Sequence, residues 1–202
     1  MVWERTSNPC RLSTWLVLPP CCCSYVYGGK EWTPRKWPSI LGLLRVATED
    51  VLGLKEHFNS AVVNVYLGGE GAVGRHADDE PLFDATRRLA TIASISLGEE
   101  RIFEVERRAD KFARHFELTS GDLVTMEGLF QADYLHGIPR SATAHGIRYN
   151  ITFRRVVCHQ RACPLSTRTT RPSRRYFSET PVAKPPTGDH VQGDGYPHPL
   201  RC

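Results

Sequence analysis

The chain has 202 residues, which suits one domain with a sizeable core, and its apolar content of 41% is ordinary for a globular protein. No apolar run approaches the roughly 20 residues that a membrane-spanning helix needs, which argues against a membrane protein. The net charge of +4 lies in residues 157–202, which hold seven Lys/Arg and three Asp/Glu. The bulk charge of residues 1–156 therefore gives no support for nucleic-acid binding, although a local basic face remains compatible with it.

Residues 1–23 show no clear periodicity, so we expect either a flexible lead-in or a poorly defined start. Their apolar run TWLVLPP is broken by Pro19 and Pro20 and makes a poor signal peptide. No cysteine lies between Ser24 and Val157, so the core is not a secreted disulfide scaffold. We expect an intracellular protein, with the nucleus as the first choice of compartment and the cytoplasm or an organelle as alternatives.

Cysteines cluster on either side of this core. Cys21, Cys22 and Cys23 are consecutive and lack the spaced pairs of a usual metal site. Cys158 and Cys163, with a histidine between them, form an equally weak pattern. The sequence favours unpaired thiols in both groups.

The first regular element expected is a helix within residues 37–54, because WPSILGLLRVATEDVLGL has apolar residues at helical spacing. Ser39 follows Pro38 and is placed to cap that helix. We expect the helix to pack on the outside of the domain. The apolar residues at this spacing are Ile40, Leu43, Leu44, Ala47, Val51 and Leu54.

After residue 59 the period changes to two, which indicates strands. Residues 98–100 and 120–121 are expected to form tight turns between them. Several short strands with turns between them predict a mainly β fold, a sandwich or barrel with the helix outside. The expected strands are residues 61–67, 91–97, 101–108, 113–119, 122–128 and 150–157.

The composition changes again at Cys158, where prolines, serines, threonines and arginines replace the apolar period. We therefore expect one domain over residues 24–157 and a disordered, basic, Pro-rich tail over residues 158–202. Such a tail is a solubilising segment or a weak electrostatic aid to nucleic-acid binding.

His76 and Asp78, in the stretch GRHADDEPLF, have the ligand types and spacing of part of a non-haem iron site. In that class two histidines and one carboxylate bind Fe(II) on one face and leave open positions. The motif alone is weak, because chance gives about one such match in a chain of this composition. A second match, at His115 and Glu117, lies inside an alternating strand.

Polar residues elsewhere strengthen the first match. Asn64 and Tyr66 alternate on one face of the strand before it, and His136 lies 58 residues beyond Asp78. In RYNITFR one strand face carries Arg148, Asn150, Thr152 and Arg154. Inward-facing arginines are costly without carboxylate partners, so this face favours a bound dicarboxylic acid.

The combination resembles the AlkB family of Fe(II)- and 2-oxoglutarate-dependent dioxygenases. The matching strings cover about residues 58–156 in order: FNSAVVNVY, RHADDEP, IASISLGEERIFEV, MEGLFQADYLHGIPR and RYNITFR. Upstream, SYVYGG and RKWPSIL look like the tyrosine-containing segment of the family and the helix after it. The resemblance implies a double-stranded β-helix (jelly roll) with one or two packing helices on the N-terminal side.

The resemblance also assigns roles to residues of this chain. His76, Asp78 and His136 would bind the iron. Residues that would bind 2-oxoglutarate are Asn64, Tyr66, Arg148, Asn150 and Arg154, with Arg148 on the distal carboxylate and Arg154 nearer the metal. Residues that would contact the substrate base are Tyr25, Tyr27, Asp79 and Glu80.

The implied activity is oxidative demethylation of N-alkylated bases of the 1-methyladenine and 3-methylcytosine type in DNA or RNA. It would use Fe(II), O2 and 2-oxoglutarate and release formaldehyde, succinate and CO2, and an alkylated base would have to leave the stack to reach the iron. Two alternatives stay open: the same chemistry on a protein side chain or a regulatory RNA mark, and a catalytically degenerate nucleic-acid-binding module. We expect a monomer with no membrane partner.

Overall fold

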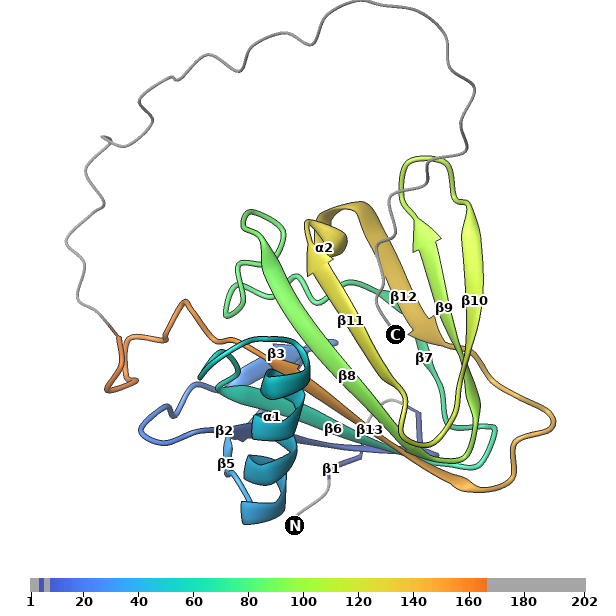
Figure 1. The fold of residues 1–202 in the computed structure, drawn as a ribbon, viewed down its shortest axis with the longest axis horizontal. Coiled ribbons are helices and arrows are strands. Elements are labelled where there is room, and N and C mark those ends of the chain that lie inside the picture. The colour runs from blue at the N-terminus through green and yellow to red at the C-terminus, as the bar shows by residue number, and fades with distance from the viewer. Residues whose placement is uncertain (1–3, 6–7, 167–202) are drawn as a thin grey trace, which may run out of the picture.

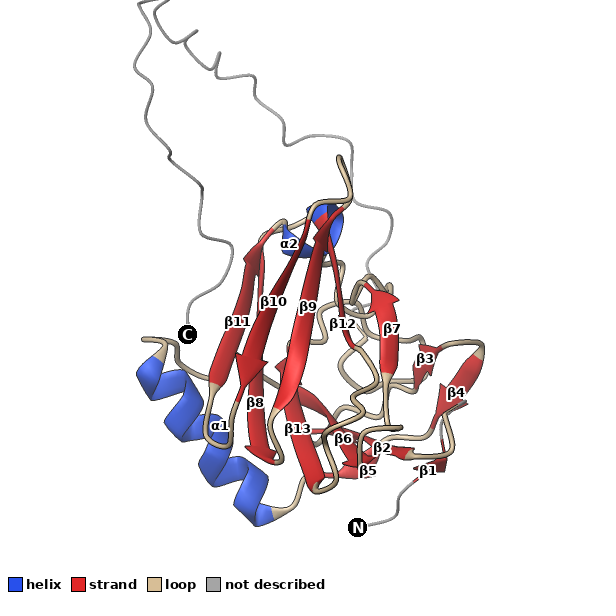
Figure 2. Ribbon diagram, turned by 90° about the vertical axis from the view of Figure 1, so that its right-hand side faces the viewer, coloured by secondary structure: helices blue, strands red, loops and turns tan. Residues whose placement is uncertain are grey.

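The computed structural model describes residues 4–5 and 8–166. Two facing β-sheets and a short hairpin form a jelly roll, as expected (Figures 1 and 2). The larger sheet contains, in spatial order, β1 (Glu4–Arg5), β2 (Arg11–Val17), β6 (Ser60–Leu67), β13 (Ile147–Arg154), β8 (Ala90–Gly98) and β11 (Leu123–Gly128), with β5 (Arg35–Lys36) beside β2. The smaller sheet contains β10 (Ala113–Leu118), β9 (Arg101–Arg107), β12 (Tyr134–Ile138) and β7 (Val73–His76). Strands β3 (Tyr25–Tyr27) and β4 (Lys30–Trp32) form the hairpin.

The core lies in three places around the larger sheet. One cluster fills the space between the sheets and includes Tyr66, Phe103 and Met126. A second packs on the outer face of the larger sheet, where helix α1 (Ser39–Val51) covers Phe58 and Phe153 (Figure 1). The third joins β2 to the β3–β4 hairpin and to the segment after β13. No helix of the described residues is long and apolar enough to cross a membrane.

Strand β13 carries the alternation that the sequence predicts. Ile151 and Phe153 belong to the cluster under α1, whereas Arg148, Asn150 and Arg154 line a cavity between the sheets. The strand is central, with β6 on one side and β8 on the other. Its polar face is therefore held in fixed register against both neighbours, with Asn150 opposite Asn64 and Ser96.

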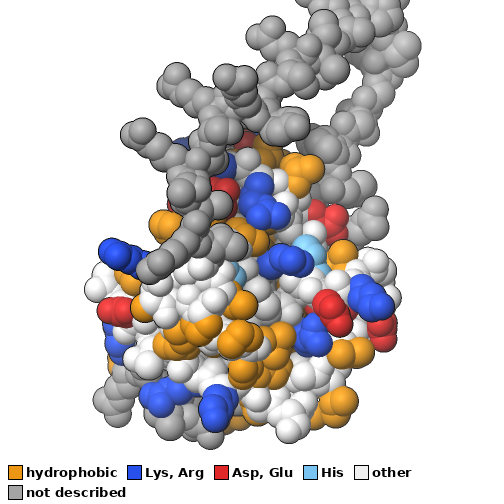
Figure 3. Space-filling view, turned by 90° about the vertical axis from the view of Figure 1, so that its left-hand side faces the viewer, with side chains coloured by type: hydrophobic (Ala, Val, Ile, Leu, Met, Phe, Trp, Pro, Cys, Tyr) orange, Lys and Arg blue, Asp and Glu red, His pale blue; other side chains and the backbone are white. Residues whose placement is uncertain are grey.

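Helix α1 lies within the predicted range, but it buries other side chains than expected. Leu41 is buried, whereas Ile40, Leu43 and Val51 are 61%, 69% and 77% exposed. Ser39 does not cap the helix, because Pro38 is the N-cap residue and no side-chain cap hydrogen bond forms. Apolar side chains also gather on the surface seen in Figure 3, with lysine and arginine side chains around them.

The prediction of a flexible lead-in or poorly defined start over residues 1–23 is wrong for Arg11–Val17, which form β2. This strand pairs with β6 along its whole length, and the apolar run TWLVLPP supplies much of it. Almost every side chain of β2 is buried. A strand covered on both faces has no alternation of apolar and polar residues, so period-two analysis does not detect it.

The two predicted turns connect different sheets rather than paired strands. Residues 98–100 lead from β8 in the larger sheet to β9 in the smaller one, and residues 120–121 lead from β10 back to β11. His136 lies inside β12, a strand that the sequence analysis did not predict.

The domain also extends beyond residue 157. Val157 and Cys158 donate backbone hydrogen bonds to the Leu82 carbonyl, and Cys163 is 4% exposed in the third core cluster. The prediction of a disordered tail from Cys158 is therefore wrong for residues 158–166. The remainder of that tail lies outside the described residues.

Candidate metal and cosubstrate site

His76, Asp78 and His136 meet where β7 and β12 run side by side. His76 ends β7 and lies opposite His136 on β12, with ring centroids 4.4 Å apart. One ligand atom from each of the three residues lies within 4.8 Å of the others. Gly137 permits this approach, because a Cβ there would lie 2.9 Å from the Val73 carbonyl oxygen of β7. The pairing of β7 with β12 thus brings together Asp78 and His136, which are 58 residues apart in the sequence.

The surroundings of both imidazoles favour the neutral form. Burial lowers the pKa of His76, and burial together with the nearby His76 lowers the pKa of His136 to about 3. Nδ1 of His76 lies 2.9 Å from the Gly74 carbonyl oxygen and donates to it, which leaves a lone pair on Nε2. A neutral imidazole with its tautomer fixed in this way is the form that binds a divalent metal.

Asp78 is fully buried and is held from two directions. Nε and Nη2 of Arg154 donate to its two carboxylate oxygens at 2.9 and 2.7 Å. Burial alone would raise the pKa of Asp78, but the Arg154 guanidinium outweighs it and lowers the pKa. The backbone N–H of Asp78 donates to Oε1 of Gln131, in the short helix α2 (Phe130–Asp133), at 2.8 Å.

This donor set fits an Fe(II) ion. A carboxylate has about four lone-pair positions, of which Arg154 takes two, so Asp78 keeps capacity for a metal. Two neutral nitrogens and one oxygen on one face match the facial triad of non-haem iron oxygenases. The second match to the motif, at His115 and Glu117, differs from the first. Both residues are exposed on β10, and the His115 side chain contacts Glu104 of the neighbouring strand.

Gln131 contacts the backbone of Asp78, and we expect it to act as a positioning residue for this cluster. We expect Gln131→Leu to weaken Mn(II) binding about 10-fold, because residues that orient metal ligands typically contribute 10–100-fold in affinity. The Asp78 backbone N–H would lose its acceptor in a fully buried place. Calorimetric titration with Mn(II) measures the effect.

Asp133→Asn is the matched control, because Asp133 lies in the same helix and is exposed. Equal affinities of Gln131→Leu and wild type would contradict the positioning role.

The cavity beside His76 and His136 fits a dicarboxylate. It lies between the two sheets, and His76 and His136 are part of its wall. Arg148 lies in its wall at 1% exposure and donates through Nη2 to Ser96 Oγ at 2.8 Å. Its Nε and Nη1 have no hydrogen-bond partner among the described residues, and burial lowers its pKa. A buried guanidinium with two unused nitrogens matches the bidentate carboxylate contact of 2-oxoglutarate.

The other expected cosubstrate residues also line this cavity. The Arg148 guanidinium lies 5.2 Å from the Tyr66 ring centroid. Asn64 accepts a 2.5 Å hydrogen bond from Ser13. The Asn150 side chain is more fully committed to its own sheet, since its amide donates to Ser94 and Ile95 and its oxygen accepts from Thr152.

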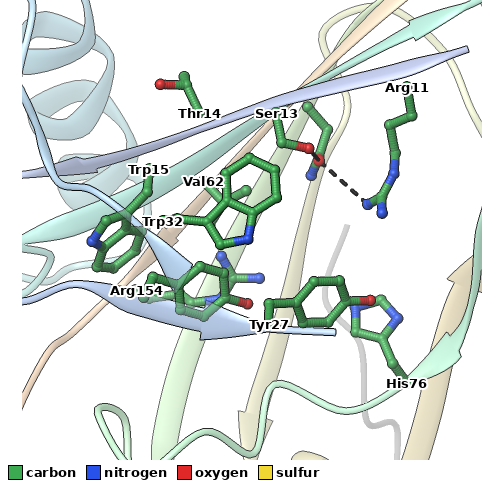
Figure 4. A pocket seen from close by; sticks show the side chains of 11 residues that line it. Arg11, Ser13, Thr14, Trp15, Tyr27, Trp32, Val62, His76 and Arg154 are labelled. Carbon is green, nitrogen blue, oxygen red and sulfur yellow. Dashed lines mark hydrogen bonds between the residues drawn. The ribbon is translucent and has the colours of Figure 1, made fainter. Parts of the chain in front are cut away.

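A second cavity adjoins the first at His76 and has aromatic walls. In Figure 4 the side chains of Tyr27 and Trp32 enter the same space, with His76 at one end. The Tyr27 ring meets the His76 ring edge-on at 5.5 Å, and the Trp32 Nε1–H has no acceptor among the described residues. Arg11, Asn64, His76 and Arg154 line both cavities.

The two expected base-lining tyrosines differ in exposure. Tyr25 is 5% exposed and stacks between Trp15 at 5.0 Å and Tyr27 at 6.0 Å. Its hydroxyl donates to Glu80 Oε1 at 2.8 Å. Tyr25 is therefore part of the wall, and Tyr27 is the more accessible of the two.

Asp79 and Glu80 lie at the mouth of the aromatic cavity, in a surface depression that also includes Tyr27 and Arg108. Asp79 is exposed. Glu80 is half-buried, and burial followed by the charge of Asp78 raises its pKa to about 7. Oε2 of Glu80 is buried without a hydrogen-bond partner among the described residues.

Sequence reasoning missed four residues that line or support these cavities: Arg11, Trp15, Trp32 and Gln131. The first two belong to β2, which the period-two search does not detect. Trp32 lies in a three-residue strand. Gln131 had no signal of its own beyond its place in the motif that contains His136.

The model of the 2OG-Fe(II) oxygenase superfamily matches residues 2–154. The Arabidopsis thaliana protein "DNA oxidative demethylase ALKBH2" is 30% identical over 158 residues, which cover 65% of this chain and 49% of that protein. The Homo sapiens "Alpha-ketoglutarate-dependent dioxygenase alkB homolog 3" is 31% identical over 164 residues, which cover 76% of this chain and 54% of that protein. The chain thus spans about half the length of these curated relatives.

Among solved structures, "The structure of OsALKBH1" aligns with a TM-score of 0.52 at 18% identity. The alignment covers 76% of this chain and 83% of that chain. At this identity the likeness concerns the fold, and it agrees with the two-sheet jelly roll described above. The family match begins at residue 2, so it includes the strand that periodicity did not detect.

Proposed function

The chain belongs to the AlkB family within the 2OG-Fe(II) oxygenase superfamily, and on this premise we propose that it removes N-linked methyl groups from nucleic-acid bases. The observation that carries the proposal is a pair of adjoining cavities that share His76, a member of the cluster formed with Asp78 and His136. The cationic cavity suits 2-oxoglutarate, and the aromatic one suits a flat, cationic base.

Fe(II), when bound with 2-oxoglutarate and O2, supplies the oxidation: one oxygen atom enters succinate, the other enters the methyl group, CO2 leaves, and the hydroxylated methyl group departs as formaldehyde. The protein supplies binding and orientation. Arg148 would hold the distal carboxylate of the cosubstrate, and Arg154 would hold Asp78 in its place. Because Arg154 and Arg11 line both cavities, they would fix how far apart cosubstrate and substrate lie.

The walls of the aromatic cavity favour a methylated ring that carries positive charge, as 1-methyladenine and 3-methylcytosine do. Tyr27 offers a π-face for a cation, a contact worth up to about 2 kcal/mol when desolvated. Asp79 and Glu80 add carboxylates at the mouth. Trp32 Nε1–H offers a donor to a base oxygen or nitrogen. The cavity adjoins the expected iron ligand His76 inside the domain, so a base would reach it from a single strand or after flipping out of a duplex.

Incubation with methylated oligonucleotides tests this function. The purified chain, with Fe(II), 2-oxoglutarate and O2, should remove methyl groups from 1-methyladenine or 3-methylcytosine in single- or double-stranded oligonucleotides, as followed by mass analysis. Succinate should form in step with demethylation. His136→Ala should be inactive, since it removes an expected iron ligand while leaving the aromatic cavity intact.

Three results separate the alternatives. Succinate formation without any change in oligonucleotide mass would indicate the same chemistry on another substrate, such as a protein side chain. Oligonucleotide binding without succinate would indicate a degenerate binding module. Full activity of His136→Ala would contradict the assignment of the site.

A further inference from the structure

Four potential metal ligands from the two ends of the domain meet outside the site described above. Cys21 and Cys23 lie between β2 and β3, and His159 and Cys163 lie in the segment after β13. Figure 1 shows these two segments next to each other, although about 140 residues separate them in the chain. One ligand atom from each of the four side chains lies within 4.8 Å of the others.

The distances match one tetrahedral zinc ion. Nδ1 of His159 lies 3.7 Å from Cys21 Sγ, 3.6 Å from Cys23 Sγ and 3.5 Å from Cys163 Sγ. Tetrahedral zinc has Zn–S bonds of about 2.3 Å and Zn–N bonds of about 2.0–2.1 Å, which gives an S···N separation of about 3.6 Å. All three measured separations lie within 0.15 Å of that value.

Burial separates these ligands from the neighbouring cysteines. Cys21, Cys23 and Cys163 are 7%, 0% and 4% exposed, whereas Cys22 and Cys158 are exposed. The chain therefore turns alternate cysteines inward at one end and skips Cys158 at the other. Three buried thiols around one imidazole form the donor set of a Cys₃His zinc site.

A disulfide explains the cluster less well than a metal. A disulfide would use two of the three sulfurs and leave one sulfur and the imidazole without a role. In addition, the backbone N–H of Gln160 donates to Cys23 Sγ at 3.3 Å, a contact that supports a metal-bound thiolate. Four protein ligands with no open position are the pattern of a structural zinc site rather than a catalytic one.

We propose that Cys21, Cys23, His159 and Cys163 bind one structural Zn²⁺ ion that ties the segment after β13 to the start of the β3–β4 hairpin. The link is reinforced by Gln160, whose side chain accepts from the Ser24 backbone N–H and donates to the Ser24 carbonyl, both at 2.9 Å. The hairpin begins one residue later with Tyr25. The ion would thus hold the tyrosine wall of the aromatic cavity in place.

Zinc analysis of the purified full-length chain tests the proposal without reference to any enzymatic activity. Because the His76, Asp78 and His136 cluster can also take zinc, every protein carries His136→Ala as a background. We expect about one zinc per chain in this background by mass spectrometry of the elements. Adding Cys163→Ser or His159→Ala should remove it, whereas adding Cys22→Ser or Cys158→Ser should retain it.

Cobalt substitution gives a second readout that does not depend on the variants folding. Co²⁺ added to the zinc-depleted His136→Ala chain should give the thiolate-to-metal charge-transfer absorption and the intense visible bands of tetrahedral cobalt. Chelation of the zinc should also lower the midpoint of thermal unfolding, since metal binding is coupled to folding.

Two results would overturn the proposal. One is a folded His136→Ala chain that contains no zinc and gives no thiolate–cobalt absorption. The other is a native disulfide between two of Cys21, Cys23 and Cys163, found by mass analysis after alkylation of the free thiols.

Discussion

Replacing Arg148 with methionine is expected to raise the Kd for 2-oxoglutarate by about two to three orders of magnitude. Removing one partner of a buried charge pair typically costs about 3–5 kcal/mol, and every 1.4 kcal/mol is tenfold in affinity. Arg148 is 1% exposed, and its Nε and Nη1 have no hydrogen-bond partner among the described residues, so a cosubstrate carboxylate would be its main charge partner. Calorimetric titration of the Mn(II)-loaded chain with 2-oxoglutarate measures the change.

Arg155→Met is the matched control, because Arg155 is exposed and its guanidinium contacts only the His57 carbonyl among the described partners. Its Kd for 2-oxoglutarate should equal that of wild type. The affinity for Mn(II) should be unchanged in both variants, since neither arginine contacts the expected metal ligands. An Arg148→Met chain that binds 2-oxoglutarate as tightly as wild type would exclude Arg148 from the cosubstrate site.

Arg148 also shows what the sequence could predict. Its side-chain direction follows from the period of two along RYNITFR, and the same period places Ile151 and Phe153 on the opposite, apolar face. These residues lie in strands with one polar and one apolar face, where local pattern determines orientation.

Other parts of the site depend on contacts that no local pattern encodes. Strand β2, which brings Arg11 and Trp15 into the cavities, is buried on both faces and therefore has no period. The cluster of three cysteines and one histidine is divided between the two ends of the domain. In the sequence, each half alone is a weak metal-binding motif. The pairing of β2 with β6, and of β6 with β13, brings those ends together.

The position of the expected iron ligand Asp78 also depends on Arg154. The resemblance implies that Arg154 lies near the metal end of the cosubstrate. The structure adds that Arg154 is bound by both oxygens of Asp78. The same carboxylate is therefore an expected iron ligand and also the counter-charge that accepts two hydrogen bonds from this buried guanidinium. Substitution at Asp78 should consequently affect both activity and folding.

Asp78→Asn is expected to abolish 2-oxoglutarate turnover, by at least about 100-fold, because loss of a ligand should exceed the 10–100-fold effect of residues that only orient ligands. It should also lower the free energy of unfolding by about 3–5 kcal/mol, since it leaves the fully buried Arg154 charge without its carboxylate. Urea denaturation of the chain without added iron measures the second effect. Arg154→Met alone should destabilise the chain by a similar amount, because it leaves Asp78 charged and buried.

The double variant Asp78→Asn, Arg154→Met separates the two roles. Removing both charges should restore most of the free energy of unfolding, since replacing a buried ion pair with uncharged groups of similar volume is often neutral. Turnover should stay lost, because the carboxylate ligand is still missing. His136→Ala serves as control, as it should lose turnover in the same way but add no unpaired charge. A double variant no more stable than Asp78→Asn alone would show that the Arg154–Asp78 pair does not couple these residues energetically.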